Sequence, residues 1–148
     1  MTEDRLPSRL QEIVEDFGIL QGREKLEYLL QFAEALPPLP DWLEAERESM
    51  MNQVHECMTP VFIYAHGEDG EIRYYFDVPP QSPTVRGYAS ILAEGTAGLS
   101  PQQVLAIPNE FYLQMGLQDV LSSQRLSGLG AILRHIKRLA REQIEEGA

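Results

Sequence analysis

The N-terminal part of the chain carries apolar side chains at intervals of three and four residues, the period of amphipathic helices. A first run ends near Gly18 and places Leu6, Leu10, Ile13, Val14 and Phe17 on one face. A second run follows Gly22 and places Leu26, Leu29, Leu30, Ala33 and Leu36 on one face. It ends at Pro37, Pro38 and Pro40, because proline lacks the amide proton that a helix needs. The pattern therefore predicts two helices followed by a connector.

The period changes from helical to alternating between about Val54 and Val78. Residues 60–65 (PVFIYA) and 71–77 (EIRYYFD) flank Glu68-Asp69-Gly70, and Asp-Gly favours a tight turn because glycine accepts positive φ. We therefore expect an antiparallel hairpin, preceded by a short extended piece that ends near Val54. His66 would then lie past the first strand. One side of the second strand would carry the apolar residues Ile72, Tyr74, Phe76 and Val78.

Helical patterns return after the hairpin. Ser82 offers an N-cap before Pro83 at the first helical position, with a stop at Gly95. Ser100 and Gln103 have the spacing of a capping box, which starts a short helix. An apolar connection then leads to a final helix, whose apolar strip runs from residue 129 to residue 140. Helices around a small antiparallel sheet predict an α+β fold, with residues 1–148 as a single domain.

Charge narrows the classes of partner. The chain has 12 basic and 23 acidic residues and a formal net charge of −11, which repels nucleic-acid phosphates. No apolar run approaches the length of a membrane span, and Glu3 and Asp4 stand where a secretory signal has bases. We therefore expect a cytoplasmic protein that binds neither membranes nor nucleic acids. Two charge clusters are interpreted as solvated surface. The acidic cluster is Asp41, Glu44, Glu46, Glu48 and Glu56, for which a basic partner is the alternative. The basic cluster is Arg134, Lys137, Arg138 and Arg141.

Cys57 is the only cysteine, which excludes an internal disulfide, a CxxC redox pair and a four-cysteine zinc site. It precedes the first predicted strand, in a loop where functional groups are common. His55 lies two residues away, so in an extended segment it would share a face with the thiol and, when protonated, favour the thiolate. The negative charge of Glu56 would instead disfavour the thiolate. A neutral, purely structural His55 fits the sequence equally well.

Other chemistry finds little support in the sequence. Neither His66 nor His135 has a metal-ligand spacing with Cys57, and we expect no metal site. No glycine-rich phosphate loop is present. A thiol hydrolase or peroxidase would need an oriented base or a resolving cysteine, and the sequence identifies neither.

Taken in order, several blocks of the sequence resemble the SufE family of sulfur-acceptor proteins. Residues 54–62 (VHECMTPVF) are similar to the family's V-x-G-C-x-S-x-V-W, with Glu56 in place of the glycine. The other blocks are Leu36-Pro37, Phe76-Asp77, residues 85–87 (VRG), residues 111–117 (FYLQMGL) and residues 121–129 (LSSQRLSGL). The resemblance covers nearly the whole chain, and the order and spacing of the blocks make it specific.

The resemblance implies an α+β fold with the cysteine on a loop beside the sheet. It also implies that Cys57 accepts sulfane sulfur from a persulfide on a cysteine desulfurase of the SufS or CsdA type. The sulfur would then pass to a SufBCD-type scaffold for iron–sulfur cluster assembly. Pyridoxal phosphate belongs to the desulfurase, and we expect no cofactor on this chain. Asp77 and Arg125 match family positions.

These expectations describe an accessory persulfide carrier that stimulates the desulfurase, and leave open whether it counts as an enzyme. His55, Asp77 and Arg125 are candidates for tuning the thiol or docking the partner, and Asp77 and Arg125 could equally pair within the fold. The alternative is an interaction or regulatory module of the same fold whose cysteine does not react. Glu56 is the residue that favours this alternative.

Overall fold

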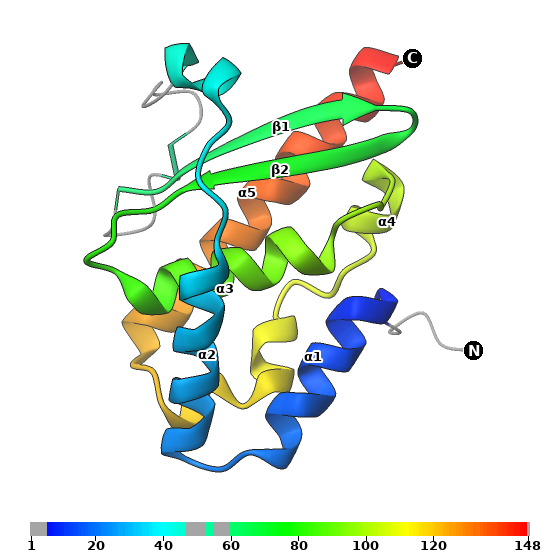
Figure 1. Ribbon diagram of the computed structural model, residues 1–148. Coiled ribbons are helices and arrows are strands. Elements are labelled where there is room, and N and C mark those ends of the chain that lie inside the picture. Colours follow the sequence, from blue (N-terminus) through cyan, green and yellow to red (C-terminus); the bar gives the residue numbers. More distant parts are fainter. Residues whose placement is uncertain (1–5, 47–52, 55–59, 148) are drawn as a thin grey trace.

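The computed structural model describes residues 6–46, 53–54 and 60–147, and has the predicted α+β architecture. Strands β1 and β2 form a two-stranded antiparallel hairpin, with helices packed around it (Figure 1). The elements are α1 (Ser8–Ile19), α2 (Arg23–Ala35), the 3-10 helix η1 (Asp41–Glu46), β1 (Phe62–Glu68), β2 (Glu71–Asp77), α3 (Pro83–Gly95), α4 (Pro101–Leu105), the 3-10 helices η3 (Phe111–Met115) and η4 (Leu117–Asp119), and α5 (Ser123–Gly147).

The hairpin register follows from its turn. Asp69 and Gly70 both have positive φ, 55° and 80°, which matches the twist of the strands they join. Glu68 therefore pairs with Glu71, and Phe62 pairs with Asp77 at the open end. The prediction that His66 lies past the first strand is wrong, because β1 continues to Glu68.

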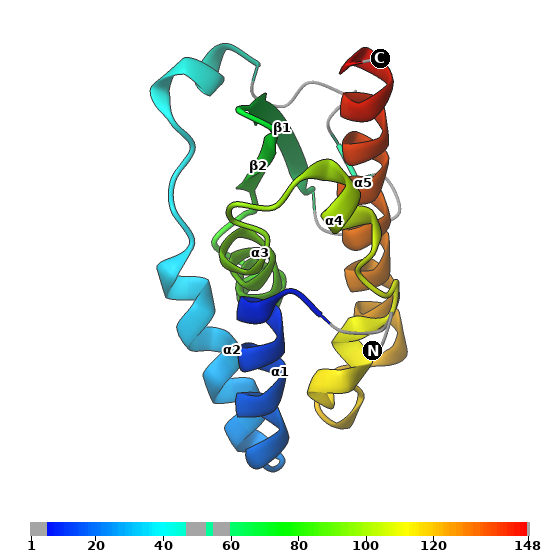
Figure 2. The ribbon, with the colours of Figure 1, turned by 90° about the vertical axis from the view of Figure 1, so that its right-hand side faces the viewer.

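The two faces of the hairpin contact different parts of the chain. Ile63, Ile72, Tyr74 and Phe76 belong to the main core, which includes side chains of α3 and α5. Phe62 and Tyr64 point to the opposite face and pack with Leu43 of η1. Figure 2 shows η1 on one side of the hairpin and α5 on the other. Trp42 of η1 is 55% exposed and makes edge contacts with the rings of His66 and Tyr75.

Two glycines of α3 allow the N-terminal helices to pack closely against it. A Cβ atom at Gly87 would lie 2.3 Å from the carbonyl oxygen of Leu29 in α2. A Cβ atom at Gly95 would lie 2.1 Å from Cδ2 of Leu10 in α1. Glycine at these positions therefore lets α1 and α2 approach α3 more closely than any other residue would allow.

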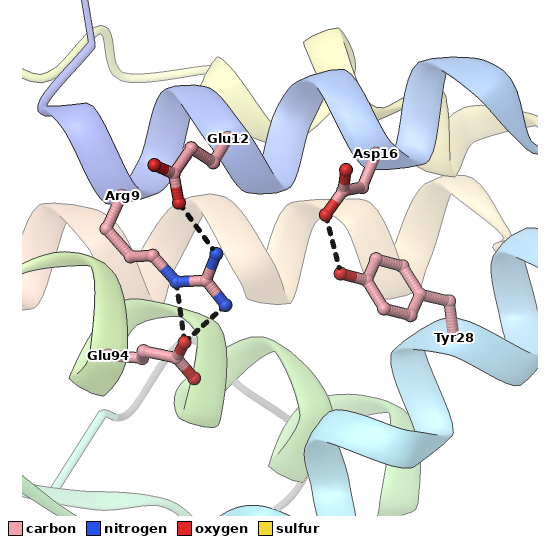
Figure 3. A network of polar contacts seen from close by, with 5 residues as sticks. All are labelled: Arg9, Glu12, Asp16, Tyr28 and Glu94. Carbon is pink, nitrogen blue, oxygen red and sulfur yellow. Dashed lines mark hydrogen bonds and ion pairs between the residues drawn. The ribbon is translucent and has the colours of Figure 1, made fainter.

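Polar contacts join the same three helices at their surface (Figure 3). The Arg9 guanidinium of α1 donates to Glu94 of α3, with Nε 2.6 Å from Oε2, and to Glu12, with Nη1 3.0 Å from Oε1. The Tyr28 hydroxyl of α2 donates to Oδ2 of Asp16 in α1 over 3.1 Å. These side chains are largely solvated, so the contacts add little to the free energy of unfolding. Their effect is to orient the three helices relative to one another.

Two helix starts differ in how they are capped. At α4 both hydrogen bonds of the predicted capping box are present, from Gln103 N to Ser100 Oγ (3.2 Å) and from Ser100 N to Gln103 Oε1 (2.9 Å). At α3 proline stands at the first position as predicted, but the Ser82 side chain makes no capping hydrogen bond.

The interpretation of the C-terminal basic cluster as a solvated face is wrong for Lys137. Its side chain is buried, and its ammonium donates to the carbonyl oxygen of Ile107 and, over 2.7 Å, to Oδ1 of Asn109. Burial lowers the pKa of Lys137, and the nearby charge of Arg141 lowers it further. Lys137 therefore ties α5 to the loop after α4, whereas Arg134 and Arg138 are exposed.

Tyr74 is predicted to couple stability to alkaline pH. Its buried hydroxyl donates to the carbonyl oxygen of Ile136 over 2.7 Å, and burial raises its pKa, as it does for Tyr88. Above about pH 10 the unfolded tyrosines ionise while these two stay protonated, so the free energy of unfolding falls as pH rises. Tyr74→Phe should lower this free energy by about 1 kcal/mol at pH 7, because a hydrogen bond is lost.

Urea unfolding at pH 7 and at about pH 11, above the ordinary tyrosine pKa, checks this. Tyr74→Phe should show a smaller loss of stability between the two pH values than the wild type, because one buried tyrosine no longer resists ionisation. Tyr75→Phe on the opposite face of β2 is the control and should keep the wild-type loss. An unchanged pH dependence in Tyr74→Phe would contradict the assignment.

Within the described ranges, no helix combines the length and the apolarity needed to cross a bilayer.

Candidate functional site

The segment that contains Cys57 leaves and re-enters the fold at one place. Val54 and Val61 are fully buried, and the Val54 N–H donates to the Val61 carbonyl oxygen over 2.8 Å. Gln53 forms an isolated antiparallel bridge with Phe62, which confirms the predicted extended piece before the cysteine. Cys57 and its neighbours His55 and Glu56 lie outside the described residues. The backbone on both sides of them is nevertheless held together at the start of β1.

Asp77 lies at this same end of the hairpin. It ends β2 and pairs with Phe62, two residues after Pro60, where the described chain resumes. Its side chain is half-buried. The register therefore places Asp77 opposite the start of β1, at the end of the hairpin where the described chain resumes.

Arg125 is used partly within the fold. It lies exposed in the first turn of α5, and its Nη1 donates to Oγ1 of Thr84 in the first turn of α3 over 2.9 Å. Its backbone N–H donates to Oγ of Ser122 over 3.2 Å. The contact with Thr84 joins the beginnings of two helices, and the exposed guanidinium still faces solvent.

Arg86 is a site residue that the sequence analysis did not single out. Its Nη1 donates to the carbonyl oxygen of Val78 over 2.8 Å, immediately after Asp77. It therefore fixes the chain as it leaves β2. The block Val85-Arg86-Gly87 was part of the family resemblance, and that was the available signal. That the Arg86 side chain would bind a backbone carbonyl eight residues earlier could not be predicted from the sequence spacing alone.

A cleft of about 550 Å³ lies beside this end of the hairpin. Pro60, Phe62 and Asp77 border it on one side, and residues 36–39 of the connector border it on another. Arg86 also lines it. The cleft therefore includes Pro60, at which the described chain resumes, and among the described residues of its wall Asp77 is acidic and Arg86 is basic.

The predicted residues are only partly brought together. Asp77 and Arg86 share the cleft wall, and Arg125 reaches Thr84, two residues before Arg86. His66 lies nearer the turn of the hairpin, against Trp42, and His135 is buried in α5. Within the described ranges, no three His, Cys, Asp or Glu side chains gather so that they could hold a metal ion.

Comparison with known proteins identifies the family. Residues 11–140 match the SufE family, described as an Fe-S metabolism associated domain. An uncharacterized SufE-like protein of Mycobacterium tuberculosis is 44% identical over 93% of this chain and 94% of its own length. A SufE-like protein of Synechocystis is 30% identical over 90% of this chain and 81% of its own length.

The fold is also similar to a known structure. The solution structure of a hypothetical protein from Thermus thermophilus superimposes with a TM-score of 0.81 and 35% identity, covering 95% of this chain and 99% of that one. The match to the family extends from α1 to α5, and thus includes every described element of the candidate site. The chain therefore belongs to the SufE family, whose domain is associated with Fe-S metabolism.

Proposed function

We propose that this protein is a sulfur carrier that accepts sulfane sulfur on Cys57 from a SufS- or CsdA-type cysteine desulfurase. The observation that carries the proposal is the position of the only cysteine of the chain. It lies between Val54 and Val61, whose backbones are joined by a hydrogen bond, and Pro60, where the described chain resumes, borders a cleft together with Asp77. A protein donor can approach a segment at the end of a sheet more easily than a residue within the core.

The transfer needs no external oxidant or reductant. The Cys57 thiolate attacks the terminal sulfur of the donor's persulfide, the donor's S–S bond breaks, and the donor's cysteine leaves as a thiolate. A new S–S bond forms at Cys57, so atoms and electrons balance. Because the chain has no second cysteine, no internal thiol can displace the sulfur before delivery.

The surrounding residues have supporting roles in this proposal. A protonated His55 would favour the thiolate, whereas the negative charge of Glu56 would disfavour it. Asp77 and the exposed guanidinium of Arg125 provide charged groups for docking. The chain itself contributes the acceptor thiol, and the pyridoxal phosphate chemistry that releases sulfur from cysteine takes place on the desulfurase.

The onward step follows from the same chemistry. A SufBCD-type scaffold is the proposed acceptor, and sulfur delivery to it would account for the family's association with Fe-S metabolism. The proposed location is the cytoplasm, where a single free thiol stays reduced.

An intact-mass measurement tests the proposal. The protein is incubated with a cysteine desulfurase from the same organism and L-cysteine, and its mass is taken without reductant. The wild type should gain one sulfur atom, and Cys57→Ser should gain none. Stimulation of the desulfurase without any added sulfur would support the regulatory alternative that Glu56 favours. The absence of both effects would overturn the carrier proposal.

A further inference from the structure

The outer edge of β2 carries backbone amides that face away from β1. The tight turn of the hairpin closes on a hydrogen-bonded pair of residues, so alternate residues of β2 direct their N–H and C=O groups outward. Ile72 shows this alternation, because its N–H donates to the Leu99 carbonyl oxygen over 2.9 Å. The amides of Tyr74 and Phe76 face the same way, and within the described part of the chain no backbone carbonyl accepts from either.

A cavity of about 360 Å³ lies along this edge, and we call it the β2-edge groove. Residues 72–76 of β2 line one side of it, and residues 36–40 of the connector line another. Three of these five connector residues are proline, which has no N–H to donate to a strand. Ala93, Thr96 and Ala97 complete the lining with small side chains. The groove therefore combines an unfilled strand edge with a mostly apolar wall.

Arg73 is the one charged side chain among the described residues that line the β2-edge groove. It is exposed, and none of the hydrogen bonds and ion pairs of the described ranges involves its guanidinium. The adjoining cleft beside Pro60 adds Arg86 and Asp77. Arg86 donates to the Val78 carbonyl oxygen, and Asp77 also has an interaction partner. The charge that the groove offers to an occupant is therefore the positive charge of Arg73.

This charge determines which occupant fits. A guanidinium and a carboxylate form two parallel, charge-assisted hydrogen bonds, so Arg73 favours an acidic side chain. The net charge of −11 repels a strongly acidic segment at long range. A segment with one carboxylate among apolar residues satisfies both conditions, and its apolar residues match Leu36, Leu39 and Ala93 of the lining. The same net charge opposes edge-to-edge pairing of two copies of this chain.

We propose that the β2-edge groove binds an extended, apolar segment of the sulfur donor that carries one aspartate or glutamate opposite Arg73. The segment adds a strand to β2 by accepting hydrogen bonds from the amides of Tyr74 and Phe76, and its carboxylate pairs with the Arg73 guanidinium. The groove adjoins the cleft that Pro60 borders, so the donor docks toward the end of the hairpin where the described chain resumes. This inference rests on the proposed function, because it takes the desulfurase as the partner.

Charge reversal at Arg73 tests the ion pair. Arg73→Glu should raise the Kd for a cysteine desulfurase from the same organism at least about tenfold, because repulsion replaces attraction. Arg134→Glu is the matched control, since Arg134 is exposed on α5 outside the groove and its reversal lowers the net charge by the same two units. It should change the Kd by no more than about twofold. Arg73→Lys keeps the charge and should bind more tightly than Arg73→Glu.

Fluorescence anisotropy with labelled desulfurase gives these Kd values, and urea unfolding shows whether the variants remain folded. Arg73 is exposed, so its substitutions should leave the free energy of unfolding close to that of the wild type.

Hydrogen–deuterium exchange tests the added strand. Exchange of the individual amides in residues 73–77 is measured with and without the desulfurase. The amides of Tyr74 and Phe76 should exchange at least about tenfold more slowly in the complex, since hydrogen-bonded amides exchange only after opening. The amide of Tyr75 already donates to β1 and should change little, which provides an internal control.

The outcomes separate this inference from the proposed function. If Cys57 gains sulfur while Arg73→Glu binds as tightly as Arg134→Glu and the amides of Tyr74 and Phe76 exchange as before, the groove proposal is overturned and the carrier proposal stands. If Arg73→Glu alone binds weakly and both amides are protected but Cys57 gains no sulfur, the docking site stands and the carrier proposal fails.

Three mixed outcomes would also overturn the groove proposal. Weak binding of Arg73→Glu without protection of the amides would place the partner on the face of the hairpin and not on its edge. Protection of the amides without any effect of Arg73→Glu would exclude the carboxylate. Protection that grows with protein concentration in the absence of desulfurase would identify a second copy of this chain as the occupant.

Discussion

Cys57→Ser is expected to bind the desulfurase as the wild type does and to lose all stimulation of its turnover. The thiolate is the group that removes sulfur from the donor, and a serine hydroxyl stays protonated at neutral pH and cannot take its place. Turnover is measured as the initial rate of alanine formation from L-cysteine. The reductant is kept limiting, because excess reductant can remove the donor's sulfur without the carrier. Fluorescence anisotropy with labelled desulfurase measures the affinity.

Glu56→Gly is the matched variant beside the acceptor. It removes a carboxylate next to the thiol, so its stimulation should equal or exceed that of the wild type. Comparison of the two variants distinguishes the effect of losing the thiol from the effect of changing the segment that carries it. Stimulation by Cys57→Ser at the wild-type level would contradict the carrier mechanism and indicate that binding alone activates the desulfurase.

Gly87→Ala should lower the free energy of unfolding by about 1–3 kcal/mol, the usual cost of overpacking a core. In an open helix the same exchange would raise stability by about 1 kcal/mol, since alanine has the better helix propensity. At Gly87 the added methyl group would lie 2.3 Å from the Leu29 carbonyl oxygen and 2.9 Å from its Cδ1 atom. The contact involves backbone, so α2 would have to move away from α3.

Gly18→Ala is the control for this prediction, because no heavy atom lies within 4 Å of a Cβ built there. Its stability should equal the wild type or exceed it by up to about 1 kcal/mol. Urea unfolding followed by circular dichroism gives both values. A Gly87→Ala variant as stable as the wild type would show that the contact between α2 and α3 adjusts without cost.

Much of the fold could be predicted because its signals are local. The Asp69-Gly70 turn fixes the hairpin register, and the alternation of Ile72, Tyr74 and Phe76 fixes the face that packs on the helices. The capping box at Ser100 likewise depends on neighbours in sequence. That residues 1–148 form one domain stays a prediction.

The contacts that were missed join different elements or loops of the chain. Lys137 belongs to a run of basic residues and has a solvent-exposed pattern, yet it binds Ile107 and Asn109. The contacts of Arg125 with Thr84 and of Arg86 with Val78 likewise depend on how α3 is placed. In the candidate site, sequence reasoning placed the cysteine just before the first strand and matched Asp77 to a family position, but it did not identify the cleft that Asp77 and the connector line.

Trp42 gives this protein an intrinsic optical probe. It is the only tryptophan of the chain, and its half-exposed indole touches the hairpin through His66 and Tyr75 rather than the main core. Its emission therefore reports whether η1 is seated on the hairpin, while far-UV circular dichroism reports the loss of the helices. Detachment of this outer element can thus be followed in an unlabelled chain and separated from global unfolding.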